Sequence, residues 1–353
     1  MKVLIVPDSF KGSLSSKQVC NCIEKGLRKA DNDLEITSIP FADGGEGFSE
    51  CMMNICKGEK IYTKCHNIYN QEIDGHITVC GESAVIESAT ASGLLKKKNV
   101  MQSSSYGTGE LIKFAVSKGF SNIILGLGGS GCCDGGAGAL AALGVRFYDE
   151  NQNIIKYPKS CDLNFIFGIN CRNSVKDINF TFACDVENEY FGKNGAAYIF
   201  APQKGARQTD VIELDEGLQR LNAFFGNDIS KVKGSGAAGG ICGGLYAIYG
   251  GTIKSGFEIL SKYSMLEEKI KAADLIVTGE GMSDRQTLMG KLPFKIAELA
   301  KRHSKKCVVI SGAIDGIKLG DKMISLVDER IDSDTAIANA AEILTEKSKY
   351  ILQ

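Results

Sequence analysis

The two ends of the 353-residue chain share one pattern, in which a buried apolar run alternates with an amphipathic helix. Near the N-terminus, an apolar run over residues 2–8 precedes helical spacing over residues 15–30, which begins at serine. Near the C-terminus, apolar runs over residues 274–281 and 307–314 flank a second helical pattern. Strands that alternate with helices predict an α/β fold with a parallel sheet covered by helices.

The middle of the chain follows a different pattern. From about residue 59, short alternating runs separated by Asn70 and by Asp74-Gly75 predict antiparallel strands. The length of the chain also favours two domains over one. We therefore expect one domain made of residues 1–60 plus 275–353, with residues 61–274 inserted as a second α/β domain.

Composition narrows the classes of function. Hydrophobic residues make up 44% of the chain, charged residues 24%, and the net charge is −1. Such a balance gives no global field for nucleic acid or an anionic membrane. The apolar run before Asp8 is too short for a secretory segment, and glycines interrupt the longest uncharged stretch, residues 234–253. We predict a cytoplasmic protein that binds neither nucleic acid nor a membrane.

Five apolar runs end in an acid-containing turn, and most of these turns are rich in glycine. The acids are Asp8, Asp43, Asp134, Asp185 and the pair Glu280 and Asp284. In open α/β sheets, ligands bind outside the carboxyl ends of the strands. Glycine lets the backbone approach a phosphate, and Mg²⁺ binds carboxylates and phosphate oxygens together. The combination predicts phosphoryl transfer, which depends mainly on positioning and charge stabilisation.

Other interpretations of the same turns stay open. A single acid after a strand is most often a helix cap or a solvated turn. Gly126, Gly128 and Gly131, followed by Asp149, match the spacing of a dinucleotide-binding fingerprint. That match permits an NAD(P)-dependent oxidoreductase, and a non-catalytic metabolite-binding protein would use the acids only as a polar cage.

Taken together, the motifs resemble those of the bacterial glycerate kinase family, whose members phosphorylate D-glycerate with ATP. The matching stretches run from residue 7 to beyond residue 290 and include "PDSFKGSLS", "PFADGGEGF", "LGLGGSGCCDGGAG", "ACDVEN" and "TGEGMSDRQTLMGKLP". The resemblance implies a discontinuous Rossmann-like domain, an inserted domain of partly flavodoxin-like character, and an active site in the cleft between them. It also implies 2-phosphoglycerate as the product.

Two stretches depart from the family pattern. The family usually has "GGSATNDGG", and this chain has Gly131-Cys132-Cys133 in place of Ala-Thr-Asn. The usual "NPL" after the "CDV" strand is here Asn188-Glu189-Tyr190. Both changes lie beside acids to which we give roles, so we expect them to alter kinetic detail more than the class of reaction.

The resemblance and the turns together suggest roles for individual residues. The expected catalytic residues are Asp185 as the base or orienting acid, Asp8, Lys11 and Lys291. The expected ATP-binding residues are Gly128, Gly129, Ser130, Gly135 and Gly136. The expected Mg²⁺ ligands are Asp134, Glu280 and Asp284. The expected substrate contacts are Asp43, Gly44, Gly45, Ser105 and Gln286. Nothing in these patterns decides between a monomer and a homodimer.

Overall fold

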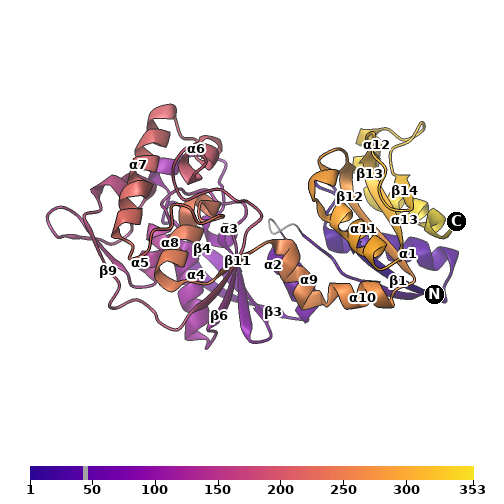
Figure 1. Ribbon diagram of the computed structural model, residues 1–353, viewed down its shortest axis with the longest axis horizontal. Coiled ribbons are helices and arrows are strands. Elements are labelled where there is room, and N and C mark those ends of the chain that lie inside the picture. Colours follow the sequence, from indigo (N-terminus) through magenta and orange to yellow (C-terminus); the bar gives the residue numbers. More distant parts are fainter. Residues whose placement is uncertain (43–46) are drawn as a thin grey trace. The chain divides into compact units, whose positions relative to one another are not determined.

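The computed structural model describes residues 1–42 and 47–353, and its contacts divide the chain into two compact units. Both ends of the chain lie in the first unit, as the indigo and yellow segments of Figure 1 show. Of the described residues, the first unit takes 1–42, 50–57 and 257–353, and the second takes 47–49 and 58–256. The first unit thus resumes at Phe257 rather than at residue 275, because Phe257 packs against Phe41.

The sheet of the first unit has five parallel strands in the order β14-β13-β12-β1-β2. The strands are β1 (Lys2–Pro7), β2 (Glu35–Ser38), β12 (Leu275–Ser283), β13 (Lys306–Ile314) and β14 (Lys322–Ser325). Numbered along this unit alone, the order is 2-1-3-4-5, which is the flavodoxin order. The flavodoxin-like strand order therefore belongs to the unit built from both ends, and the resemblance had led us to expect it in the inserted part.

Helices cover this sheet because their apolar stripes must be buried. Ser15 and Gln18 form a capping box that starts α1 (Ser16–Ala30), and Val19, Ile23 and Leu27 then lie fully buried against the sheet strands. The other helices with residues in this unit are α2 (Phe48–Cys56), α9 (Gly256–Ser264), α10 (Leu266–Ala272), α11 (Leu292–Arg302), α12 (Ser333–Ala338) and α13 (Ala340–Ser348).

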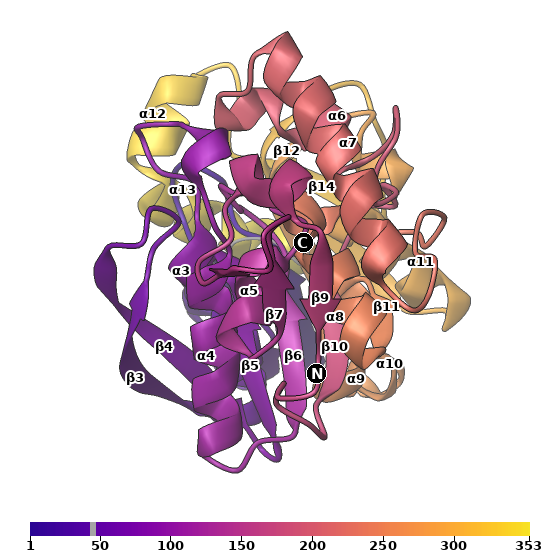
Figure 2. The same cartoon turned by 90° about the vertical axis from the view of Figure 1, so that its left-hand side faces the viewer.

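The second unit contains a six-stranded mixed sheet in the order β11-β10-β6-β5-β4-β3 (Figure 2). The strands are β3 (Glu59–His66), β4 (Glu72–Cys80), β5 (Ser83–Glu87), β6 (Asn122–Gly126), β10 (Asn179–Ala183) and β11 (Thr252–Lys254). Pairing is antiparallel from β3 to β5, as the alternating runs predict, and parallel from β5 to β11. The expected turn at Asp74-Gly75 is wrong, because both residues lie inside β4 and pair with β3, and the turn before β5 is at residues 81–82. The parallel strands end at one edge, with Glu87, Gly126 and Ala183 side by side.

The remaining elements of the second unit surround that sheet and share one hydrophobic core. The helices are α3 (Ser88–Ser92), α4 (Tyr106–Ser117), α5 (Ala137–Ala142), α6 (Ala196–Phe200), α7 (Gln208–Phe224) and α8 (Ile241–Tyr249). A small antiparallel sheet consists of β7 (Arg146–Tyr148), β8 (Ile154–Ile155) and β9 (Gly168–Asn170). Among the helices of residues 1–42 and 47–353, none is long and apolar enough to span a membrane.

Candidate active site

The first unit brings together acids from two strands that are distant in sequence. In the strand order 2-1-3-4-5, the neighbours β1 and β12 form the switch point where ligands bind at the carboxyl edge of an open sheet. Pro7 pairs with Gly279, and the Asp8 N–H continues the pairing with a 2.9 Å bond to the Gly279 carbonyl. Asp8 therefore directly follows β1, and Glu280 lies within the neighbouring strand β12, one residue beyond the Gly279 that pairs with Pro7.

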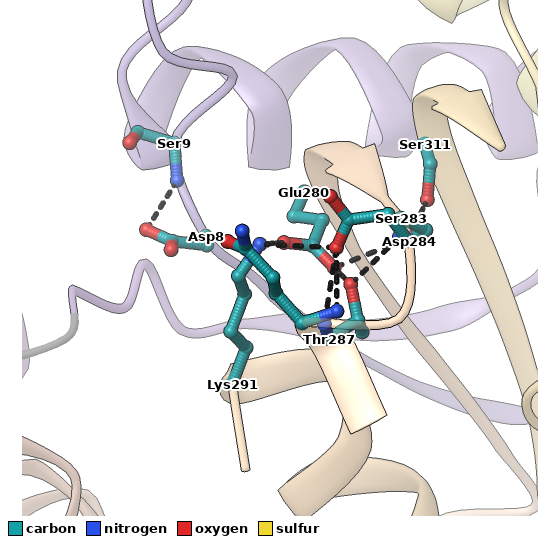
Figure 3. Close-up of polar contacts among 9 residues, drawn as sticks. Asp8, Ser9, Glu280, Ser283, Asp284, Thr287, Lys291 and Ser311 are labelled. Atoms are coloured by element: carbon teal, nitrogen blue, oxygen red, sulfur yellow. Dashed lines mark hydrogen bonds and ion pairs between the residues drawn. The ribbon is translucent and has the colours of Figure 1, made fainter. Parts of the chain in front are cut away.

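Glu280 is held firmly although it is nearly buried, with 6% of its surface exposed. Its Oε1 accepts hydrogen bonds from Thr287 Oγ1 at 2.6 Å and Ser283 Oγ at 3.2 Å. Its other oxygen, Oε2, lies 3.5 Å from the ammonium of Lys291 (Figure 3). One carboxylate oxygen is thus fixed by hydroxyls, and the other is oriented toward a cation.

Lys291 is the residue that precedes α11, and it lies between two acids. Besides Glu280, its ammonium lies 3.7 Å from Asp284 Oδ1. The same Asp284 oxygen accepts from the N–H groups of Gln286 and Thr287, so it also fixes the turn between β12 and α11. Gln286 is exposed in that turn and does not line the adjacent cavity.

A cavity of about 400 Å³ opens at this edge of the sheet. Its charged lining consists of Asp8, Lys11, Glu280 and Lys291. Two lysines beside two carboxylates can neutralise a phosphate, and the carboxylates can hold a divalent cation that the phosphate shares. Four residues that the sequence analysis selected separately therefore face one cavity within one unit.

The second unit has its own polar edge, at the loop after β6. The N–H groups of Gly128, Gly129 and Ser130 have no acceptor among the residues that the structure describes. The buried Lys204 donates to Ser130 Oγ at 2.9 Å and to the Cys132 carbonyl at 2.7 Å. No described carboxylate lies within ion-pair distance of this ammonium. Free amides beside a buried cation suit an anionic group.

Gly135, Gly136, Ser105 and Asp134 have partners inside the protein, which differs from their expected ligand-binding roles. Asp134 is fully buried and accepts from Ser105 N, Ser105 Oγ, Gly136 N and Gly138 N. Burial raises the pKa of the Asp134 carboxyl, while these hydrogen bonds act in the opposite direction. The Gly135 N–H donates to the Gly239 carbonyl. These groups hold the start of α4 against the loop before α5, and no metal ion is needed to satisfy them.

Asp185 lies at the same carboxyl edge as the loop after β6, two residues beyond the end of β10. Its side chain is exposed, and its Oδ1 accepts from the Gly256 N–H at 3.1 Å. Glu87, at the end of β5, is a further acid at this edge, and it accepts from the Ser49 N–H at 2.7 Å. The sequence analysis missed Glu87, because no glycine follows the apolar run "AVIE".

Three of the residues that depart from the family pattern, Cys132, Cys133 and Tyr190, are packed in the core. Cys132 and Cys133 are fully buried core residues, and burial raises the pKa of the Cys133 thiol to about 12. Tyr190 is also fully buried, and its hydroxyl donates to the Gly135 carbonyl at 2.7 Å. Cys132, Cys133 and Tyr190 therefore lie in the interior, whereas Asn188 and Glu189 are only partly buried, and Glu189 pairs with Lys231 at 3.1 Å.

Asp43, Gly44 and Gly45 lie outside the described residues. For residues 1–42 and 47–353, no three acids, histidines or cysteines form a group that could hold a metal ion by themselves. Asp134 belongs to the second unit, and Glu280 and Asp284 belong to the first.

The geometry does not favour the oxidoreductase alternative. Asp149 would have to follow a strand beside β6 to reach a dinucleotide ribose. It instead follows β7 in the small antiparallel sheet, and it accepts hydrogen bonds from Asn151 N, Asn153 N and Asn153 Nδ2. Asp149 is therefore not placed to be the acidic partner of the three glycines.

Acids, lysines and unpaired amides among the described residues, at the carboxyl edges of parallel strands, fit a small-molecule kinase, although such a fold serves many functions. Comparison with known proteins makes the class specific. Residues 3–353 match the model of the glycerate kinase family, and the chain belongs to that family. This membership confirms the resemblance seen in the motifs, and ATP is the phosphoryl donor that it implies.

Individual relatives are similar over nearly the whole chain. Glycerate 2-kinase of Escherichia coli (strain K12) is 39% identical over 327 residues, which is 89% of this chain and 86% of the relative. Glycerate kinase of Bacillus cereus (strain ATCC 10987 / NRS 248) is 37% identical, covering 98% and 94%. A crystal structure assigned to glycerate kinase 2 from Salmonella typhimurium LT2 superposes with a TM-score of 0.89 at 35% identity, covering 99% of this chain and 97% of that one.

Proposed function

We propose that the protein transfers the terminal phosphoryl group of ATP to the 2-hydroxyl of D-glycerate, giving 2-phosphoglycerate. The observation that carries the proposal is the cluster of Asp8, Lys11, Glu280 and Lys291 around one cavity at the switch point of the first sheet. The name of the Escherichia coli relative, glycerate 2-kinase, supports the choice of hydroxyl. A transferring phosphoryl group needs positive charge and positioning, and this cluster supplies both.

The residues of this cluster have distinct tasks in the proposal. Lys11 and Lys291 neutralise charge on the phosphoryl oxygens as the bond to the leaving group lengthens. Glu280 keeps Lys291 directed into the cavity, because its Oε2 lies 3.5 Å from the ammonium. Asp284 fixes the turn that presents Lys291, through its bonds to the amides of Gln286 and Thr287.

In the proposal, residues of the second unit bind an anionic group and supply the general base. The free amides of Gly128, Gly129 and Ser130, with Lys204 beneath them, bind phosphate oxygens of ATP. Asp185 accepts the proton of the 2-hydroxyl, and its exposed carboxylate is oriented by the Gly256 N–H. Because proton transfer is late in a loose transition state, a carboxylate of ordinary basicity is sufficient.

Mg²⁺ fits the cavity of the first unit only together with ATP. The Glu280 oxygen that faces Lys291, with Asp8 lining the same cavity, offers one or two carboxylates, and Mg²⁺ in kinase sites takes that number plus phosphate oxygens and water. When bound, the ion neutralises charge on the phosphates. Asp134 cannot share this task in its present state, because both of its oxygens accept hydrogen bonds from the protein.

The decisive experiment measures ADP release with ATP, Mg²⁺ and D-glycerate, while enolase is supplied to convert 2-phosphoglycerate into phosphoenolpyruvate. We expect ADP release that needs D-glycerate, stops when EDTA removes the metal, and is matched by phosphoenolpyruvate. ADP without phosphoenolpyruvate would contradict phosphorylation at the 2-hydroxyl. Absence of ADP release would contradict the kinase and favour a metabolite-binding protein. Light scattering on the same preparation would decide between a monomer and a homodimer.

A further inference from the structure

The cavity of the first unit has a second lining that the chemistry above does not use. The charged residues come from β1, β12 and the start of α11, on one side of the strand order. The other side, beyond β13, is apolar and consists of Leu326, Val327, Ala336, Ile337 and Ala340. These residues belong to the segment after β14 and to α12 and α13. The cavity is therefore half charged and half apolar.

The apolar lining is fixed in place by the sheet. The N–H groups of Leu326 and Val327 donate to the carbonyls of Ser311 and Gly312, which extends the pairing of β14 with β13. Asp332 accepts from the Thr335 N–H at the start of α12, which brings Ala336 and Ile337 to the cavity. Ile337 remains 54% exposed although it is a large apolar residue. An exposed isoleucine that faces a preformed cavity suits a ligand with an apolar face.

Only one of the two proposed substrates has such a face. D-glycerate carries oxygen on each of its three carbons, so it gains nothing from an apolar wall. ATP carries charge at one end and a flat purine at the other. A cavity of about 400 Å³ with one charged and one apolar side matches that distribution.

We propose that the apolar side, formed by Leu326, Val327, Ala336, Ile337 and Ala340, is the subsite for the adenine ring of the nucleotide. The phosphates then extend toward Lys11 and Lys291 in the same cavity. Ser333 lines the cavity as well and offers a hydroxyl to the edge of the ring. The inference rests on the proposed function, because it takes ATP as the ligand. It adds that the first unit holds the adenine ring.

The test uses titration calorimetry to compare the binding of ADP with that of inorganic tripolyphosphate, which carries phosphate charge but has no adenine ring. In Ile337→Asn, the dissociation constant for ADP should rise about five- to tenfold, while that for tripolyphosphate changes less than about twofold. Val327→Thr keeps the shape of the side chain and adds a hydroxyl, and it should also raise the dissociation constant for ADP. The matched control is Tyr350→Asn, because Tyr350 is also 54% exposed but lies outside the cavity.

The outcomes separate this inference from the kinase itself. Equal weakening of both ligands, or no change for either, would overturn the adenine subsite even if the wild type phosphorylates glycerate. Selective loss of ADP binding supports the subsite whether or not ADP release is seen with glycerate. A wild type that does not bind ADP would overturn both proposals.

Discussion

At the scale of single residues, carboxylates with similar sequence surroundings have opposite environments. In the sequence, Glu280 and Asp134 both come after an apolar run and beside glycines, and both are buried in the structure, Glu280 within β12 and Asp134 in the loop before α5. Glu280 directs one oxygen at Lys291, whereas Asp134 accepts hydrogen bonds on both oxygens from the protein itself. An acid that faces a cation across a cavity can serve a ligand, and an acid enclosed by amides serves the fold.

Replacing Lys291 tests the charged side of the cavity. Lys291→Ala should lower kcat/KM for glycerate by about a hundredfold or more, because two acids then face the phosphates without their cation. The control is Lys295→Ala on the same helix, where the ammonium lies over the Phe257 ring at 4.8 Å. We expect the control to stay close to wild type in the coupled assay. Equal effects of the two substitutions would remove Lys291 from the site.

The pKa of Asp134 predicts a pH dependence of stability. Because burial raises its folded-state pKa above 3.8, the carboxyl stabilises the fold most at low pH, and this contribution is lost as pH rises through the folded pKa. Asparagine cannot ionise, so the stability advantage of wild type over Asp134→Asn should be largest near about pH 4 and shrink toward pH 7. Urea denaturation across that range measures it, and an advantage independent of pH would contradict the assignment.

At the scale of elements, glycines let the loops around α5 and α8 pack backbone to backbone. A Cβ on Gly239, whose φ is +69°, would lie 2.0 Å from the Cys132 carbonyl oxygen. A Cβ on Gly244 would lie 2.2 Å from the Gly135 carbonyl oxygen. The stretches "GGAG" and "GSGAAGG" therefore join two helix starts behind the loop of Gly128–Ser130, which makes much of their glycine content structural.

Two neighbouring substitutions should separate this packing from backbone flexibility. Gly239→Ala should destabilise the protein by about 2–5 kcal/mol. The new Cβ would clash with the backbone of Cys132, and alanine would also have to adopt a left-handed conformation. Ala238→Gly should be neutral or stabilising by up to about 1 kcal/mol, because Ala238 already has a φ of 54°. Chemical denaturation of both variants provides the comparison. Similar losses in the two would show that the close contact is not the cause.

The sequence analysis was sound for local structure and weaker for long-range structure. Hydrophobic spacing located α1, β12 and the antiparallel strands β3 and β4, because these patterns depend on neighbours in the chain. Strand order depends on pairing between distant segments, so the sequence pattern predicted no order for either sheet, and the order 2-1-3-4-5 appears only in the structure. The same local patterns predicted the acids near strand ends. The groups that contact these acids come from distant parts of the chain, which local patterns do not show. Sequence therefore could not distinguish Asp134 from Glu280.

At the scale of the whole molecule, each unit has a hydrophobic core of its own. Separate cores predict separate unfolding, since cooperativity requires shared buried surface. In scanning calorimetry we expect the calorimetric enthalpy to exceed the van't Hoff enthalpy. Gly239→Ala, in the second unit, should lower the midpoint temperature of only one of the two transitions. A single two-state transition that shifts as a whole in the variant would contradict this expectation.

The central position of β1 has a consequence for how the chain is made. Thr278 donates its hydroxyl proton to the Val6 carbonyl across 272 residues, and β12 is the strand that joins β1 to the rest of its sheet. During translation, β1 and α1 leave the ribosome before the second unit, but they lack their main partner until β12 has emerged, 272 residues later at Thr278. The second unit, which ends at residue 256, is synthesised before β12. The native pairing of β1 therefore has to wait until the second unit has been made, and Asp8 and Lys11 reach their site only once β12 is available.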